Sequence, residues 1–159
     1  MPDISSRLVL LSGLLTGTAD ILAAFLQFYI RTGRDPVKPV STFIASGVFG
    51  PSAFSGGAVM IVAGLLLHYL VAFLFTVFFF FLCKRWQLLS RSWIVTGIVY
   101  GIFIWVVMNL VVVPLSRVPA MPPGTVWNKI TAALILITMI GLPLAYIAHR
   151  YRKPARNIS

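Results

Sequence analysis

The chain has 159 residues, of which 59% are hydrophobic and 10% charged, and its mean hydropathy is +0.96. A soluble domain carries about 25% charged residues, so this composition excludes an ordinary water-soluble globule. Thirteen basic residues against three acids give a formal net charge of +10. Because these bases lie between long apolar stretches, we expect them to meet anionic lipid headgroups of a bilayer rather than nucleic acid.

Four apolar stretches are long enough to cross a membrane. A hydrocarbon core of about 30 Å requires about 20 helical residues, and the stretches are Leu8–Ile30, Ala58–Leu82, Trp93–Leu115 and Val126–Ala148. Backbone groups in lipid must be satisfied within the span, which favours helices. The sequence therefore predicts an all-α membrane four-helix bundle, with residues 1–159 forming a single integral membrane domain.

Two features modify this simple bundle. The first outer connection contains an apolar segment, Val40–Phe49, which at about ten residues is too short to span and predicts a short interfacial or re-entrant helix. Pro114 and Pro143 fall late in the third and fourth spans. Because proline lacks an amide donor, we expect each to bend or end its helix.

The basic residues predict the orientation in the membrane. Four spans place both termini on one side, together with eight of the 13 bases: Arg7, Lys84, Arg85, Arg91, Arg150, Arg152, Lys153 and Arg156. The other side holds five: Arg31, Arg34, Lys38, Arg117 and Lys129. The positive-inside rule then places both termini in the cytoplasm, where the basic ends would contact anionic lipids.

Small residues mark the faces through which the spans should pack. Helices in lipid associate through close backbone approach, because burying apolar side chains away from lipid tails gains little. The first span carries Gly13 and Gly17 in a GxxxG pattern, and the third carries Gly97 and Gly101. In the second span, Gly64 shares a stripe with the polar residue His68. We therefore expect these glycines at helix contacts.

Three polar residues form a candidate cluster inside the membrane. Asp20 is the acid that falls within a span, and His68 lies at the same depth, near the midplane; Asn109 lies about one turn nearer the outside. An Asp at a span centre costs about 2.5–3.5 kcal/mol on insertion scales, so it requires a partner or a neutral state. One interpretation is a structural latch in which Asp20 is neutral or hydrogen-bonded to His68. The other is a proton or ion relay, or a ligand site at the midplane. We favour the latch, because residues that would form a path to either surface are scarce.

No motif in the sequence indicates a catalysed reaction or a metal site. The familiar hydrolase, metalloprotease and nucleotide-binding motifs are absent. Cys83 is the single cysteine, so neither a disulfide nor a thiolate zinc site is expected within the chain. We predict no metal, no cofactor and no enzymatic activity. A lipid-modifying enzyme is the weakest alternative, since the sequence shows no set of polar residues that could act on a lipid headgroup.

Three segments together carry a family resemblance: Gly13–Ala24, Leu67–Tyr69 and Met108–Ser116. They resemble small bacterial inner-membrane proteins and, more distantly, the YagU-like family, a member of which has a longer first outer loop than this chain. The resemblance implies a four-span protein of the bacterial inner membrane and assigns no catalytic residue. We therefore expect a non-enzymatic protein that self-associates or serves as an accessory subunit of a larger complex. The alternative is a small proton-linked transporter or channel using Asp20 and His68.

Overall fold

The computed structural model describes residues 5–85, 92–119 and 125–151, and its regular elements over these ranges are all helices. The first and second long helices are α1 (Ser6–Thr32) and α3 (Gly57–Arg85). Between them lie α2 (Val37–Phe49) and a 3₁₀ segment, η1 (Gly50–Phe54). The third long helix joins α4, the π-helical segment η3 and α5; the fourth joins α6, the π-helical segment η4 and α7. Their bounds are Trp93–Val107, Met108–Val112, Val113–Leu115, Val126–Leu136, Ile137–Gly141 and Leu142–Arg150.

The four long helices are each long and apolar enough to cross a membrane. They cover Ser6–Thr32, Gly57–Arg85, Trp93–Leu115 and Val126–Arg150, and each contains one of the predicted stretches. The prediction of an all-α four-helix bundle is confirmed, and the four spans make the chain a multi-pass membrane protein.

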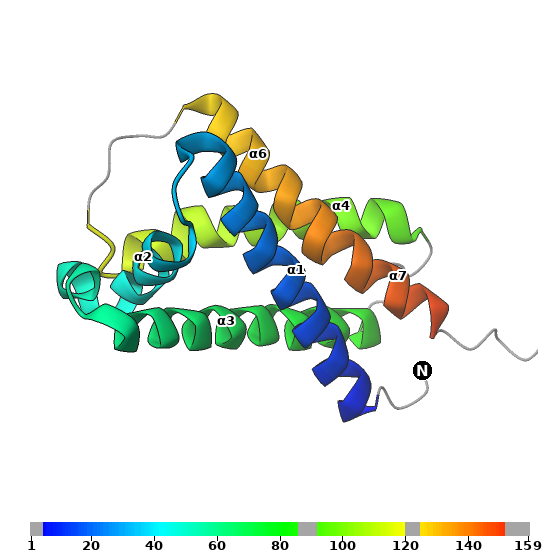
Figure 1. Cartoon of the computed structure of the whole chain (residues 1–159). Helices are drawn as coiled ribbons and strands as arrows, with labels where there is room; N and C mark the ends of the chain where they lie inside the picture. The colour runs from blue at the N-terminus through cyan, green and yellow to red at the C-terminus, as the bar shows by residue number, and fades with distance from the viewer. Residues whose placement is uncertain (1–4, 86–91, 120–124, 152–159) are drawn as a thin grey trace, which may run out of the picture.

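Successive long helices run in opposite directions, and α1 and the α6–α7 helix cross the other two obliquely (Figure 1). One end of the bundle, the terminal end, therefore carries the start of α1, the end of α3, the start of α4 and the end of α7. The opposite end, the α2 end, carries the remaining helix ends and α2. Of the bases predicted to be cytoplasmic, Arg91, Arg152, Lys153 and Arg156 lie outside the described residues.

The short helix predicted in the first outer connection is α2, which extends from Val37 to Phe49. It packs closely on the first two turns of α3, where a Cβ placed on Gly64 would overlap the backbone carbonyl of Ser41. The amide of Arg117, just after α5, donates to the carbonyl of Gly47 at 2.9 Å. Thus α2 joins α3 to the far end of the third long helix.

The best-packed part of the interior lies toward the terminal end. Its buried members come from the last turns of α3 and from α4, η4 and α7: Phe79, Phe80, Cys83, Tyr100, Ile104, Ile140, Leu144 and Ala145. The aromatic rings of Phe79 and Tyr100 meet there with centroids 4.7 Å apart. Of the two cavities described below, one lies near the middle of the bundle and the other lies toward the α2 end.

Each of the two late prolines follows a π-helical segment. Pro114 comes after η3 and Pro143 after η4, both at the second position beyond the segment. The amide of Val113 donates to the carbonyl of Met108, and that of Leu142 to Ile137, five residues back in each case. A wider turn accommodates a proline ring that would otherwise conflict with a carbonyl of the preceding turn. The helices are thus widened locally beside both prolines. The third long helix ends at Leu115, one residue after Pro114, whereas α7 continues from Pro143 to Arg150.

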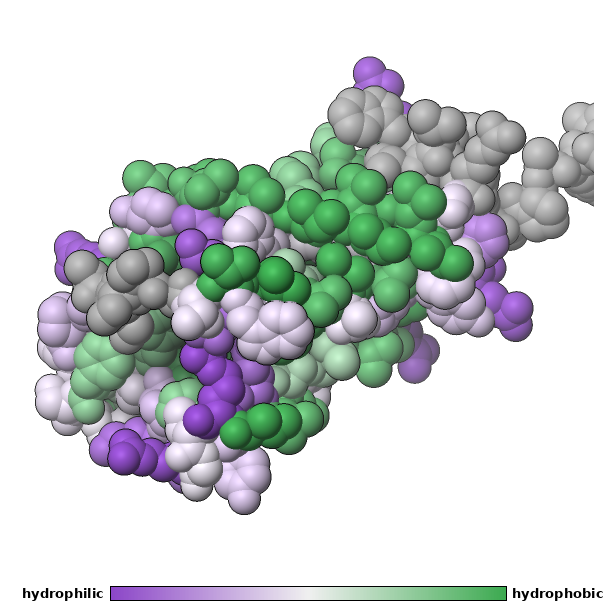
Figure 2. All heavy atoms as spheres, turned by 90° about the horizontal axis from the view of Figure 1, so that it is seen from above, coloured by the Kyte–Doolittle hydropathy of each residue, from purple (hydrophilic) through white to green (hydrophobic). Residues whose placement is uncertain are grey.

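The outward surface of the bundle is strongly apolar. Along α3, for example, Leu66, Leu70 and Leu74 point outward and are 66%, 55% and 62% exposed. Figure 2 shows one face, on which hydrophobic side chains cover most of the middle and hydrophilic ones gather toward the ends. A surface of this kind suits lipid contact, since large apolar patches are rare on soluble monomers.

The contact between α2 and α3 generates a prediction. Gly64→Ala should lower the free energy of unfolding in detergent by about 1–3 kcal/mol, because its methyl group would collide with the Ser41 backbone. The measurement is thermal or denaturant unfolding of the purified protein. Gly47→Ala is the matched control, because its Cβ would meet only the Ser116 Cβ at 3.8 Å. Equal stability of the two variants would contradict this packing.

Candidate functional site

The candidate site begins where α1 and α3 approach most closely. A Cβ on Gly17 would lie 3.1 Å from the Cβ of Ala72, and one on Gly13 would collide with the ring of Phe73. Both glycines of the first GxxxG pattern therefore lie at a contact between helices. Without side chains at these positions, the α1 backbone comes within hydrogen-bonding reach of side chains on α3.

Two hydrogen bonds link α1 to α3 at this contact. The Nε2–H of His68 donates to the carbonyl oxygen of Gly17 at 2.8 Å, a bond that requires the proton on Nε2 because the carbonyl can only accept. The hydroxyl groups of Thr18 and Tyr69 share a hydrogen bond at 2.8 Å. The rings of His68 and Tyr69 also lie edge to face, with centroids 5.6 Å apart. Adjacent residues of α3 thus hold adjacent residues of α1.

Asp20 and His68 line a common small cavity of about 60 Å³. The rest of its lining is apolar and comes from α3, α4, η3, α6 and η4: Val71, Ala72, Phe75, Ile104, Met108, Leu136 and Ile140. The cavity has room for water, for which about 10–15 Å³ suffices. Among the described residues, Asp20 forms no hydrogen bond or ion pair with His68, whose Nε2 is engaged by Gly17. The structure therefore brings the two residues to one cavity without joining them directly.

Asn109 lies away from this cavity. Its side chain is exposed, and its amide donates to the carbonyl of Trp105 on the preceding turn at 2.8 Å. The third long helix instead presents Ile104 and Met108 to the cavity. Asn109 follows Met108 by one residue and is therefore turned about 100° from it. The expectation that Asn109 could join Asp20 and His68 does not hold in this structure.

The glycines of the other helices also lie at contacts. Cβ atoms on Gly97 and Gly101 would collide with the backbone of Leu142 and Ile137, so α4 packs directly on the fourth long helix. Gly141 meets the carbonyl oxygen of Gly97 from the other side. Gly64 lies against α2. These close contacts all form within one chain.

Two tyrosines that the sequence analysis assigned no role make contacts between helices. Tyr69 bonds Thr18, and the hydroxyl of the buried Tyr100 donates to the backbone carbonyl of Phe75, linking α4 to α3. Both positions carried a usable signal: Tyr69 is adjacent to His68, and Tyr100 follows Gly97 by three residues, about 60° around the helix. A buried phenol requires a hydrogen-bond partner, and in lipid that partner is another helix.

The described residues contain no group of three His, Cys, Asp or Glu side chains placed to hold a metal ion. Fold and site together define a class: a multi-pass membrane bundle in which His68 and Tyr69 of α3 form hydrogen bonds with α1. Comparison with protein-family models, with curated proteins and with solved structures finds no match.

The paired hydroxyl groups of Thr18 and Tyr69 generate a prediction. Thr18→Val and Tyr69→Phe should each lower the free energy of unfolding, and the double variant should lose little more than either single one. A double-mutant cycle should give a coupling energy of about 0.6 kcal/mol, the average for hydrogen bonds between membrane helices. Thr138→Val is the control, because the Thr138 hydroxyl bonds only carbonyls of its own helix. Strict additivity of Thr18→Val and Tyr69→Phe would contradict the bond.

Proposed function

We propose that this chain is a non-enzymatic protein of the bacterial inner membrane, with both termini in the cytoplasm, that acts as an accessory subunit of a larger membrane complex or by self-association. The orientation is supported by the division of the 13 bases, eight of which fall on the side of the termini.

One observation carries the non-enzymatic part of the proposal. Three side-chain hydrogen bonds join one helix to another: His68 with Gly17, Thr18 with Tyr69, and Tyr100 with Phe75. Other buried hydroxyl groups, such as those of Thr16 and Thr76, bond carbonyls of their own helix. The cavity beside Asp20 measures about 60 Å³, whereas sites for small organic ligands measure about 300–1,000 Å³. It has room for water and is too small for such a substrate. The cluster therefore suits a latch that keeps α1 and α3 in register.

A partner would contact the outside of the bundle. The glycine pairs that motivated self-association already pack against other helices of the same chain, so they are not available to a second copy. The outward apolar face of α3, which includes Leu66, Leu70 and Leu74, remains available for contact with lipid or with another membrane helix.

Extraction in a mild detergent followed by native mass spectrometry tests this function. We expect a stable oligomer or a defined complex that survives dilution. Leu70→Lys, on the outward face, should dissociate a complex that uses this face, while Leu22→Lys, on the outward side of α1, is the matched control. Recovery of the native protein only as a lone monomer, in several mild detergents, would count against the proposal.

A small proton-linked transporter or channel is the second candidate, and a specific observation favours it. Asp20 and His68 face the same cavity with no direct bond between them, so water there could connect the two groups. A relay also requires a polar path from this cavity to both surfaces.

Proteoliposomes distinguish the two functions. The accessory role predicts that the native protein gives no pH-driven proton flux above empty vesicles, and that Asp20→Asn leaves this baseline unchanged. A flux in the native protein that Asp20→Asn abolishes, and that Asp35→Asn on the exposed loop preserves, would establish the transporter and contradict the latch.

A further inference from the structure

A second and larger hollow lies toward the α2 end, between the last turns of α1 and the fourth long helix. Its volume is about 400 Å³, within the range of about 300–1,000 Å³ typical of ligand sites. The lining comes from α1, α6 and η4: Ala23, Leu26, Gln27, Ile30, Arg31, Trp127, Asn128, Thr131, Ile135 and Met139. It is separate from the cavity beside Asp20, with which it shares no lining residue.

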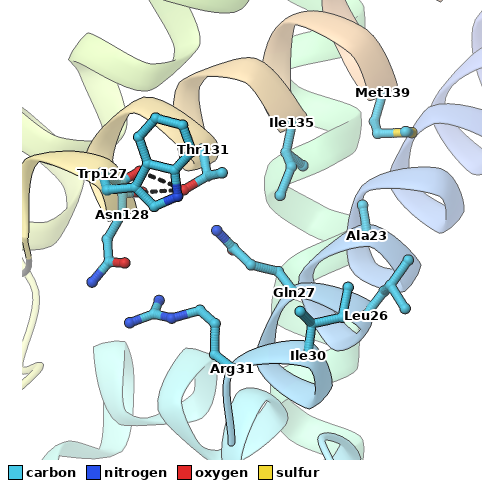
Figure 3. Close-up of a pocket in the computed structure, with 10 residues that line it drawn as sticks. All are labelled: Ala23, Leu26, Gln27, Ile30, Arg31, Trp127, Asn128, Thr131, Ile135 and Met139. Carbon is cyan, nitrogen blue, oxygen red and sulfur yellow. Dashed lines mark hydrogen bonds between the residues drawn. The ribbon is translucent and has the colours of Figure 1, made fainter.

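The hollow is polar at one end and apolar at the other. Figure 3 shows the side-chain ends of Gln27, Arg31 and Asn128 gathered on one side, while Ile135 and Met139 lie toward the other. Ala23 and Arg31 are eight residues apart on α1, which separates the two ends by about 12 Å. This length is close to half of a hydrocarbon core of about 30 Å, the depth of one lipid leaflet.

The side chains at the polar end of the hollow, which we call its mouth, have unused hydrogen-bonding capacity. Among the described residues, the side chains of Gln27, Arg31 and Asn128 make no hydrogen bond or ion pair with one another or with other side chains. Arg31 is the next-to-last residue of α1, and Trp127 is the second residue of α6, so both lie at a helix end. An indole and a guanidinium at this level match the headgroup zone of a bilayer.

The surroundings identify the occupant. A hydrocarbon environment offers no water to fill an apolar groove at membrane depth, so lipid chains are the molecules at hand. A guanidinium presents planar donors that match a phosphate, and the two side-chain amides add further donors beside it. No acid lines the hollow to compensate the charge of Arg31.

We propose that the hollow between α1 and α6 is a binding site for an anionic membrane phospholipid. One acyl chain lies along Ala23, Ile135 and Met139, and the phosphate of the headgroup meets Arg31, Gln27 and Asn128. The site is at the end of the bundle opposite the termini, away from the basic residues assigned to the cytoplasmic side. It goes beyond the accessory function proposed above and does not depend on it.

Native mass spectrometry of the purified full chain tests this site, with phosphatidylglycerol and phosphatidylcholine of matched acyl chains as probes. The native protein should bind phosphatidylglycerol more tightly than phosphatidylcholine. Arg31→Gln should weaken that binding about fivefold, the equivalent of one basic residue near a lipid surface, and leave phosphatidylcholine binding nearly unchanged. Lys129→Gln is the matched control. Lys129 is an exposed base next to Asn128 on α6, and its side chain does not line the hollow.

A second variant tests the apolar end. Ala23→Phe should reduce retention of both lipids by filling the hollow, while thermal unfolding of the lipid-free protein shows that the fold is intact. Equal affinity for the two lipids, equal losses from Arg31→Gln and Lys129→Gln, or unchanged retention in Ala23→Phe would each overturn the proposal. Displacement of the lipid by millimolar inorganic phosphate would also overturn it, since the site would then hold a free anion.

Discussion

The structure depends on one close contact between α1 and α3, centred on Gly17. In lipid, apolar burial gives little force between helices, so their association relies on close packing and hydrogen bonds. Gly17 contributes to both: its missing side chain lets Ala72 and Tyr69 approach, and its carbonyl accepts the hydrogen bond of His68. Asp20 lies nearly one turn further along α1, so the same contact brings it to the cavity that His68 faces.

The oblique path of α1 gives the bundle two different interiors (Figure 1). Toward the terminal end, Phe79, Tyr100 and Leu144 fill the space between the helices. Toward the α2 end, α1 and α6 leave a hollow with Arg31 at its mouth. On the side of α3, α2 packs against Gly64. We infer that the tightly packed half maintains the arrangement of helices, while the open half provides the surface available to a lipid.

Much of the fold follows from local features of the sequence. Hydropathy and length locate all four spans, because each membrane helix must be apolar along its own length. Counting residues from the span ends places Asp20 and His68 at one depth. It cannot show that His68 bonds to a backbone carbonyl rather than to Asp20, since this depends on how α1 and α3 rotate and approach. Residue counting also cannot predict the hollow beside Arg31, because this hollow lies between α1 and α6, two helices distant in sequence. For Asn109, a rotation of about 100° from Met108 places it off the cavity.

The hydrogen bond between His68 and Gly17 is the central element of this account, and solid-state NMR can measure it in lipid bilayers. The sample would carry ¹⁵N in the histidine rings and ¹³C in the glycine carbonyls, with His149→Gln leaving His68 as the single histidine. The account predicts a protonated Nε2 dipolar-coupled to a glycine carbonyl, as expected for a nitrogen 2.8 Å from the carbonyl oxygen. An Nε2 without a nearby glycine carbonyl would contradict the latch.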